Sequence, residues 1–71
     1  MPEIPLAPLE RILKKAGAAR VAEDAKAKLS EVLEDYAIVV GARANQLAKH
    51  ANRKTVTGAD IALAVKEGVK K

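Results

Sequence analysis

The segment KHANRKTVTGAD, residues Lys49–Asp60, joins two helical patterns and decides how this chain folds. The first residues of this segment end one set of apolar residues at helical spacing, and its last residues begin another. Between them stand two adjacent cations, Arg53 and Lys54, followed by the triplet Thr-Val-Thr, whose β-branched side chains favour extended backbone. We therefore ask why so short a connecting segment, called the joint below, carries two cations.

Two amphipathic helices, one short and one long, are predicted before this joint. The short helix spans residues 8–16, because Pro8 suits a first helical turn and Gly17 suits a left-handed stop. The long helix begins near Glu23 and reaches Ala51 without meeting a proline; Asn52 then tolerates the left-handed conformation that ends a helix. The long helix measures roughly 43 Å at 1.5 Å per residue.

A third helix, again short, is predicted after the joint. Thr57 and Asp60 have the spacing of a capping box, with Asp in place of the usual Glu. Each helix has an apolar side, and the first also has a charged side that faces solvent. The apolar positions are Leu9, Ile12, Leu13 and Ala16 in the first helix; Ala25, Leu29, Val32, Leu33, Tyr36, Val40, Ala44, Leu47, Ala48 and Ala51 in the second; and Ile61, Ala64, Val65 and Gly68 in the third. The charged side of the first helix carries Glu10, Arg11, Lys14 and Lys15.

The unequal helix lengths predict self-association. Two helices of about 15 Å each cannot wrap the long one, and Ile38 and Val39 make its middle apolar on more than one side. The simplest closed arrangement is a twofold dimer in which two long helices cross antiparallel near residues 36–41. Gly41 then permits close approach at the crossing, or it is a tolerated helix-weakening glycine.

Composition narrows the function. The chain has 71 residues, no cysteine and one histidine, so a single domain over residues 1–71 is expected, without disulfide or metal. The sequence shows no recognisable combination of a nucleophile with an activating base, so we expect no enzyme activity, cofactor or small-molecule substrate. No membrane span or signal peptide is evident, which predicts a cytoplasmic protein with no membrane partner.

The net charge of +4 makes a polyanionic partner plausible. Proteins that bind single strands usually stack bases on aromatic side chains, and Tyr36 is the sole aromatic residue here. Contacts with the backbone of a duplex are therefore favoured over single-strand binding.

The chain resembles the archaeal histone family from IPLAPLERILKKAGAARV through LAKHANRKTVTGADIALAV. The residues that carry the resemblance are the proline-rich entry, the motif AGA-R-V in the first loop, RKTV in the second, and His50 and Asp60 beside that loop. The resemblance implies an all-α histone fold of short, long and short helices, assembled as a handshake homodimer. In such a dimer the triplets 19–21 and 54–56 of different chains can pair as short parallel strands.

The resemblance also assigns roles to individual residues. It implies that Arg11 and Arg20 face minor grooves, that Lys54 contacts phosphate, and that Thr55 orients Arg20 and meets the DNA backbone. Lys14 and Lys15 are further candidates for phosphate contacts, or form a solvated face. The resemblance implies an internal salt bridge that fixes the second loop, between Arg53 and Asp60.

A second candidate surface surrounds His50. A lone histidine at the edge of an apolar stripe is more often a packed or capping residue than a ligand. The resemblance instead implies that His50 joins dimers into four-helix bundles, and Leu63 lies off the core side of its helix, as an interface residue does. The residues of this assembly patch are Leu47, His50, Asp60 and Leu63.

The expected function is that of a chromatin architectural protein on the chromosome, which wraps double-stranded DNA with little sequence preference. Dimers are expected to assemble further, either as tetramers or as a filament. The packaging protein is expected as a homodimer, with a heterodimer with a paralogous histone left open. One alternative function is that of a histone-fold transcription-factor subunit that pairs with another chain. Another is a basic amphipathic helix on a membrane surface, against which the missing Trp and Phe anchors count.

Overall fold

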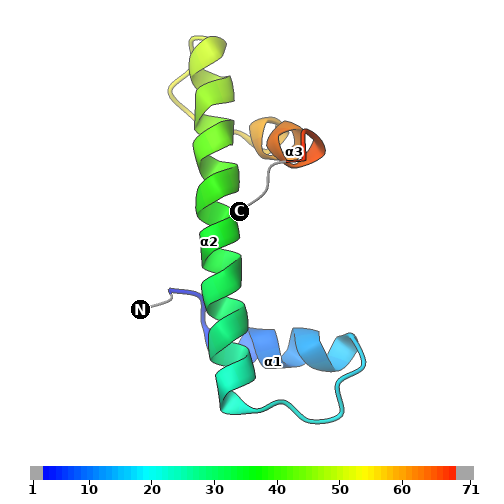
Figure 1. The fold of residues 1–71 in the computed structure, drawn as a ribbon. Coiled ribbons are helices and arrows are strands. Elements are labelled where there is room, and N and C mark those ends of the chain that lie inside the picture. The colour runs from blue at the N-terminus through cyan, green and yellow to red at the C-terminus, as the bar shows by residue number, and fades with distance from the viewer. Residues whose placement is uncertain (1–2, 69–71) are drawn as a thin grey trace. The chain divides into compact units, whose positions relative to one another are not determined.

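The computed structural model describes residues 3–68, which form three α-helices and no strand (Figure 1). Helix α1 spans Leu6–Lys15, α2 spans Glu23–His50 and α3 spans Gly58–Lys66. The predicted all-α plan of short, long and short helices is confirmed. The triplets 19–21 and 54–56 form no strand in this single chain.

The helix ends follow local chemistry. After α1, Gly17 has a φ of +113°, and after α2, Asn52 has a φ of 60°. Both residues adopt the positive φ that was expected of them, which glycine and asparagine tolerate better than other residues. At the end of α2 the N–H of Arg53 donates to the carbonyl of Ala48 at 2.9 Å, so the chain turns while a helix carbonyl stays satisfied. Asn52 therefore fixes where the second loop begins.

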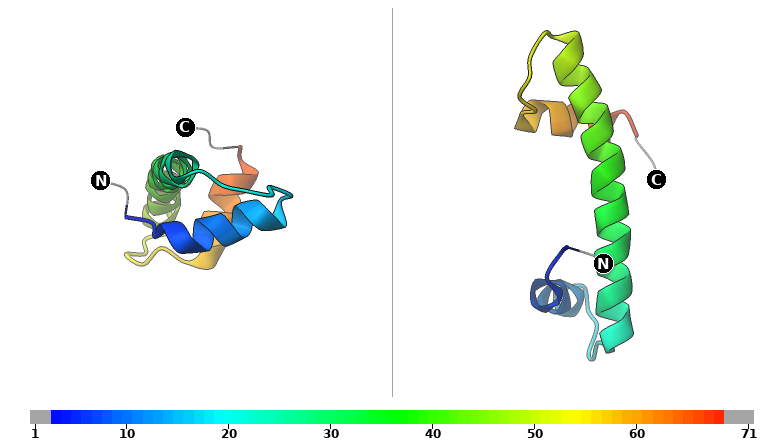
Figure 2. Two further views of the ribbon diagram at one scale, coloured as in Figure 1. Left: turned by 90° about the horizontal axis from the view of Figure 1, so that it is seen from below. Right: turned by 90° about the vertical axis from the view of Figure 1, so that its left-hand side faces the viewer.

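Contacts within the chain divide it into two compact units, residues 1–34 and 35–71, and α2 contributes to both. In the first unit, α1 lies across the first turns of α2 (Figure 2). Leu9 is the buried residue of α1, and the hydroxyl of Ser30 on α2 donates to the carbonyl of Ile4 at 2.9 Å. The segment before α1 is thereby tied to α2.

The residues of α2 that are buried near α1 differ from the sequence prediction. Ala25 was expected on the buried stripe but is exposed, and Lys26 and Ser30 are buried in its place. Lys26 and Ser30 lie four residues apart and therefore share one side of the helix, which is the side that faces α1. Glu10, expected on the solvent side of α1, reaches Lys26 instead.

In the second unit, α3 packs beside the second half of α2 (Figure 2). The apolar cluster consists of Val40, Ala44 and Ala64, with Leu47 packed against it. Small residues let the two helices approach closely. Arg43 on α2 also holds Glu67, just after α3, with Nε to Oε1 at 2.8 Å.

Several positions expected in the core remain exposed in the single chain. Ala16 and Ala51 are exposed because each lies just beyond the end of its helix, where no other element of residues 3–68 covers it. Among residues 3–68 the buried apolar side chains are two larger ones, Leu9 and Val40, and three alanines. The exposed large apolar side chains are Ile12, Val32, Tyr36, Ile38, Val56, Ile61, Leu63 and Val65.

Within residues 3–68, no helix combines the length and the apolar character that crossing a membrane requires.

Candidate functional site

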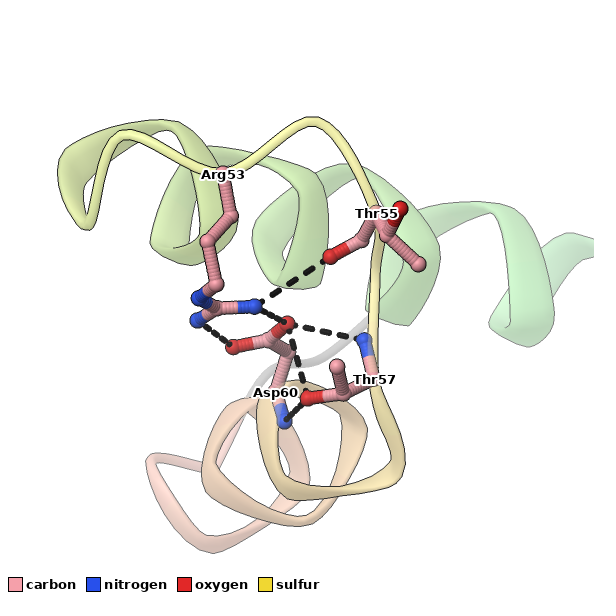
Figure 3. Close-up of polar contacts among 4 residues, drawn as sticks. All are labelled: Arg53, Thr55, Thr57 and Asp60. Atoms are coloured by element: carbon pink, nitrogen blue, oxygen red, sulfur yellow. Dashed lines mark hydrogen bonds and ion pairs between the residues drawn. The ribbon is translucent and has the colours of Figure 1, made fainter.

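The second loop, residues 51–57, is held by a network that centres on the carboxylate of Asp60 (Figure 3). Thr57 is the N-cap of α3: its hydroxyl accepts a hydrogen bond from the N–H of Asp60, and the carboxylate accepts one from the N–H of Thr57. This reciprocal pair is a capping box, confirming the spacing read from the sequence. It satisfies two backbone donors at the start of α3.

Arg53 completes the network from the other side of the loop. Its Nη1 and Nη2 donate to the two oxygens of Asp60, each at 2.8 Å, and Nη1 also donates to the carbonyl of Thr55 at 3.2 Å (Figure 3). A guanidinium fork that binds both oxygens fixes orientation as well as distance. The side chain of Asp60 is only 6% exposed, whereas that of Arg53 is 41% exposed. Arg53 therefore fixes the loop by binding a buried carboxylate from the surface.

The contacts around Asp60 shift the pKa values of Asp60 and Arg53. Arg53, followed by the backbone N–H of Thr57, holds the pKa of the Asp60 carboxyl well below its ordinary value. The same contact raises the pKa of Arg53. Both groups are therefore charged across the range in which proteins normally work.

The stability of the second loop is expected to fall in acid. Because the folded pKa of Asp60 lies below its unfolded value of about 3.9, the stabilisation is complete above that value and is lost as the pH falls toward the folded pKa. Thermal melts at several pH values between 7 and 2 measure this. The control is Asp60→Asn, whose midpoint should be lower at pH 7 and should depend less on pH. Equal acid dependence in both proteins contradicts the assignment.

The candidate DNA-contacting cations lie on both units. Arg11, Lys14 and Lys15 are exposed on α1, and Arg20 is exposed in the loop that follows it. Lys14 contacts Glu10 one helical turn earlier, with Nζ to Oε2 at 3.4 Å. In the second unit Lys54 and Thr55 are exposed in the second loop. Among residues 3–68, ion pairs are absent from Arg11, Lys15, Arg20 and Lys54.

The assembly patch lies around the end of α2 and the start of α3. His50 is exposed and, with Gln46 and Lys49, lines a hollow that is open to solvent. Leu63 is 45% exposed, whereas Leu47 is half-buried against the cluster of the second unit. Asp60 contributes little surface, although within residues 3–68 its Oδ1 accepts a hydrogen bond from Arg53 alone and retains capacity for a second donor.

Two cations with structural contacts were missed in the sequence. Lys26 is buried between Glu23 and Glu10, and Arg43 binds Glu67 across the second unit. The spacing of Glu23 and Lys26, three residues apart on one helix, is a detectable pattern. The partners Glu10 and Glu67 come from other elements, so only the fold reveals them.

No group of three or more His, Asp, Glu or Cys side chains among the described residues is arranged to hold a metal ion.

Comparison with known proteins places this chain in a family. Residues 2–65 match the family model described as histone-like transcription factor (CBF/NF-Y) and archaeal histone. The chain is 56% identical to a subunit of the archaeal histone HAN1 of Thermococcus zilligii over 66 residues, which cover 93% of this chain and 98% of the relative. It is 48% identical to probable archaeal histone 3 of Methanocaldococcus jannaschii, with the same coverage of both chains. With matches over nearly its whole length, a three-helix plan and the sequence motifs in agreement, this chain belongs to the family of histone-like transcription factors and archaeal histones.

Proposed function

We propose that this protein is a homodimer that binds and packages double-stranded DNA, largely without regard to sequence. The proposal rests on a difference between two groups of cations, those that are paired within the fold and those that are not. Arg43 and Arg53 are bound by carboxylates within the fold, whereas Arg11, Lys15, Arg20 and Lys54 are exposed and form no ion pair among residues 3–68. Unpaired, exposed cations are what a polyphosphate backbone attracts. The names of both relatives, archaeal histones, support the same function.

The dimer is supported by the apolar surface that one chain leaves open. Tyr36 and Val32, both on the apolar stripe of α2, are 38% and 40% exposed. Burial of such exposed apolar area by a partner stabilises the dimer by about 25 cal/mol per Å² removed from water. In the proposed dimer the long helices cross at this stripe, and residues 1–71 act as one histone-fold domain completed by the partner.

DNA contact is assigned to the loops and to α1. Arg11 and Arg20 face minor grooves, Lys54 binds phosphate, and Thr55 supports Arg20 of the other chain; Lys14 and Lys15 add phosphate contacts. The proposal gives no helix a place in a major groove, where bases are read, so any preference among sequences arises from how easily the duplex bends. This mode places the protein on the chromosome.

Removal of one loop cation is expected to weaken binding without loss of the fold. Arg20→Ala and Lys54→Ala should each lower the affinity for unrelated duplexes alike and flatten the salt dependence by about one charge per lost contact. Fluorescence anisotropy over a salt series measures both effects, and thermal melts check the fold. The control is Lys28→Ala, which removes an exposed cation that is paired with Glu31 on α2. Equal effects of Lys28 and Lys54 contradict the assignment.

The assembly patch is proposed to join dimers along DNA. It is exposed at His50 and Leu63, and a twofold dimer has one copy at each end, so that contacts can continue from dimer to dimer. Asp60 lies at its edge, where Oδ1 can accept a hydrogen bond from His50 of a neighbouring dimer.

A variant of the exposed part of the patch separates dimer function from further assembly. Leu63→Glu should leave a folded dimer that binds DNA but protects only a short unit from nuclease. Three contacts per dimer at intervals of about 10 bp give a unit on the order of 30 bp. The parent should give longer fragments that rise in steps of this size. The same fragment ladder from both proteins would show that the patch is ordinary surface.

A second candidate is a subunit that pairs with a different histone-fold chain. One relative is named as a subunit, and the family description includes transcription factors. The mass of the purified protein distinguishes the two: the homodimer proposal requires two chains of this sequence in the absence of any other protein.

A further inference from the structure

Four charged side chains meet where α1 crosses α2. The ammonium of Lys26 lies 2.9 Å from Oε1 of Glu10 on α1 and 2.5 Å from Oε1 of Glu23 on its own helix. The other oxygen of Glu10 lies 3.4 Å from the ammonium of Lys14. Two lysines therefore share one carboxylate, and Glu10 is the one acidic residue of α1.

The two lysines differ in what else they can do. The side chain of Lys26 is 10% exposed, so it cannot reach a ligand in solvent. The side chain of Lys14 is 53% exposed, and its contact with Glu10 is a long pair one helical turn apart. Such exposed pairs are worth little and are readily exchanged for another anion.

The titration of Glu10 follows the same order. Lys26 is the largest cause that lowers the pKa of the Glu10 carboxyl, and Lys14 is the next. Glu23, followed by Glu10, raises the pKa of Lys26. The carboxylate of Glu10 is thus negative at neutral pH and has a buried counterion that does not depend on Lys14.

We propose that Lys26 is a positioning residue for DNA binding: it holds and neutralises Glu10, so that Lys14 can exchange its long contact with that carboxylate for one with phosphate, and α1 presents a cationic surface. This inference rests on the proposed function, because it requires α1 to face DNA. Without Lys26, Glu10 would take Lys14 as its remaining partner and would repel phosphate. A second interpretation, in which the pair only fastens α1 to α2, predicts different results for the same variants.

Charge-matched variants test the proposal. Lys26→Met keeps the length of the side chain and removes its charge; it should weaken duplex affinity by about 3- to 10-fold near 0.1 M salt and flatten the salt slope by about one unit per protomer. Adding Glu10→Gln should restore both quantities. Adding Glu23→Gln instead gives the same net charge, but the carboxylate removed lies on α2, is 82% exposed and has no contact with Lys14; it should restore neither.

The outcomes separate this inference from the proposed function. If Glu10→Gln restores binding and Glu23→Gln does not, the inference about Lys26 is upheld. If both restore binding equally, or neither does, that inference is overturned although the parent still binds DNA. If Lys26→Met does not fold, Glu10→Gln alone decides: binding as tight as the parent's or tighter upholds the inference, whereas weaker binding shows that the pair only fastens α1. Failure of the parent to bind duplex DNA contradicts the proposed function itself.

Discussion

Arg53→Ala is expected to lower the melting midpoint by roughly 10 °C for a domain of this size, whereas Lys54→Ala should leave it nearly unchanged. Arg53 donates to both oxygens of Asp60, and that carboxylate also caps α3 through Thr57. Removal of the guanidinium leaves a carboxylate that is 6% exposed without its charged partner, which costs more than the loss of an exposed contact.

The neighbouring cation provides the control for this prediction. Lys54 is exposed and forms no ion pair among residues 3–68, so its removal takes nothing from the fold of the single chain. Thermal melts and duplex titrations of the two variants should give opposite patterns: Arg53→Ala loses stability first, and Lys54→Ala loses binding first. The reverse pattern would exchange the roles that we assign to the two residues.

Tyr36→Glu should leave the chain largely unfolded at micromolar concentrations, and the melting midpoint of the parent should rise with protein concentration. In a single chain Tyr36 is 38% exposed, and a substitution at such a position usually changes stability by about 0.5 kcal/mol or less. In the proposed dimer the same position lies where two long helices cross, so a carboxylate there loses its water. Unfolding coupled to dissociation makes the midpoint depend on concentration.

Conservative substitution is the control for Tyr36. Tyr36→Phe keeps the ring and removes only the hydroxyl, so its midpoint should remain near that of the parent. A midpoint that is independent of concentration, together with a folded Tyr36→Glu protein, would show that the stripe on α2 does not form the dimer contact.

The local features of this fold are predictable from the sequence because each depends on residues close together in the chain. Gly17 and Asn52 end helices through their own backbone freedom, and Thr57 with Asp60 caps α3 three residues apart. The contact of Arg53 with Asp60 spans one loop, and family resemblance implies it. In these cases pattern and structure agree.

Contacts between elements were harder to predict. The sequence suggested Ala25 for the buried stripe, but α1 approaches α2 on the side of Lys26, and Glu10 turns toward it. Helical periodicity gives the apolar side of a helix but not the direction from which a neighbour arrives. Gly41 is a further case, because a Cβ at this position has no contact within 4 Å among residues 3–68, apart from its chain neighbours and the backbone of its own helix. Packing among the described residues therefore gives no reason for that glycine.

In the proposed function, two copies of this chain bind one duplex whatever its sequence. The mass of the complex with a duplex of about 30 bp, measured by light scattering with DNA in excess, tests it most directly. We expect two chains per duplex, and equal affinities for two duplexes of unrelated sequence at the same salt concentration. One chain per duplex, or binding to only one of the two sequences, would contradict it.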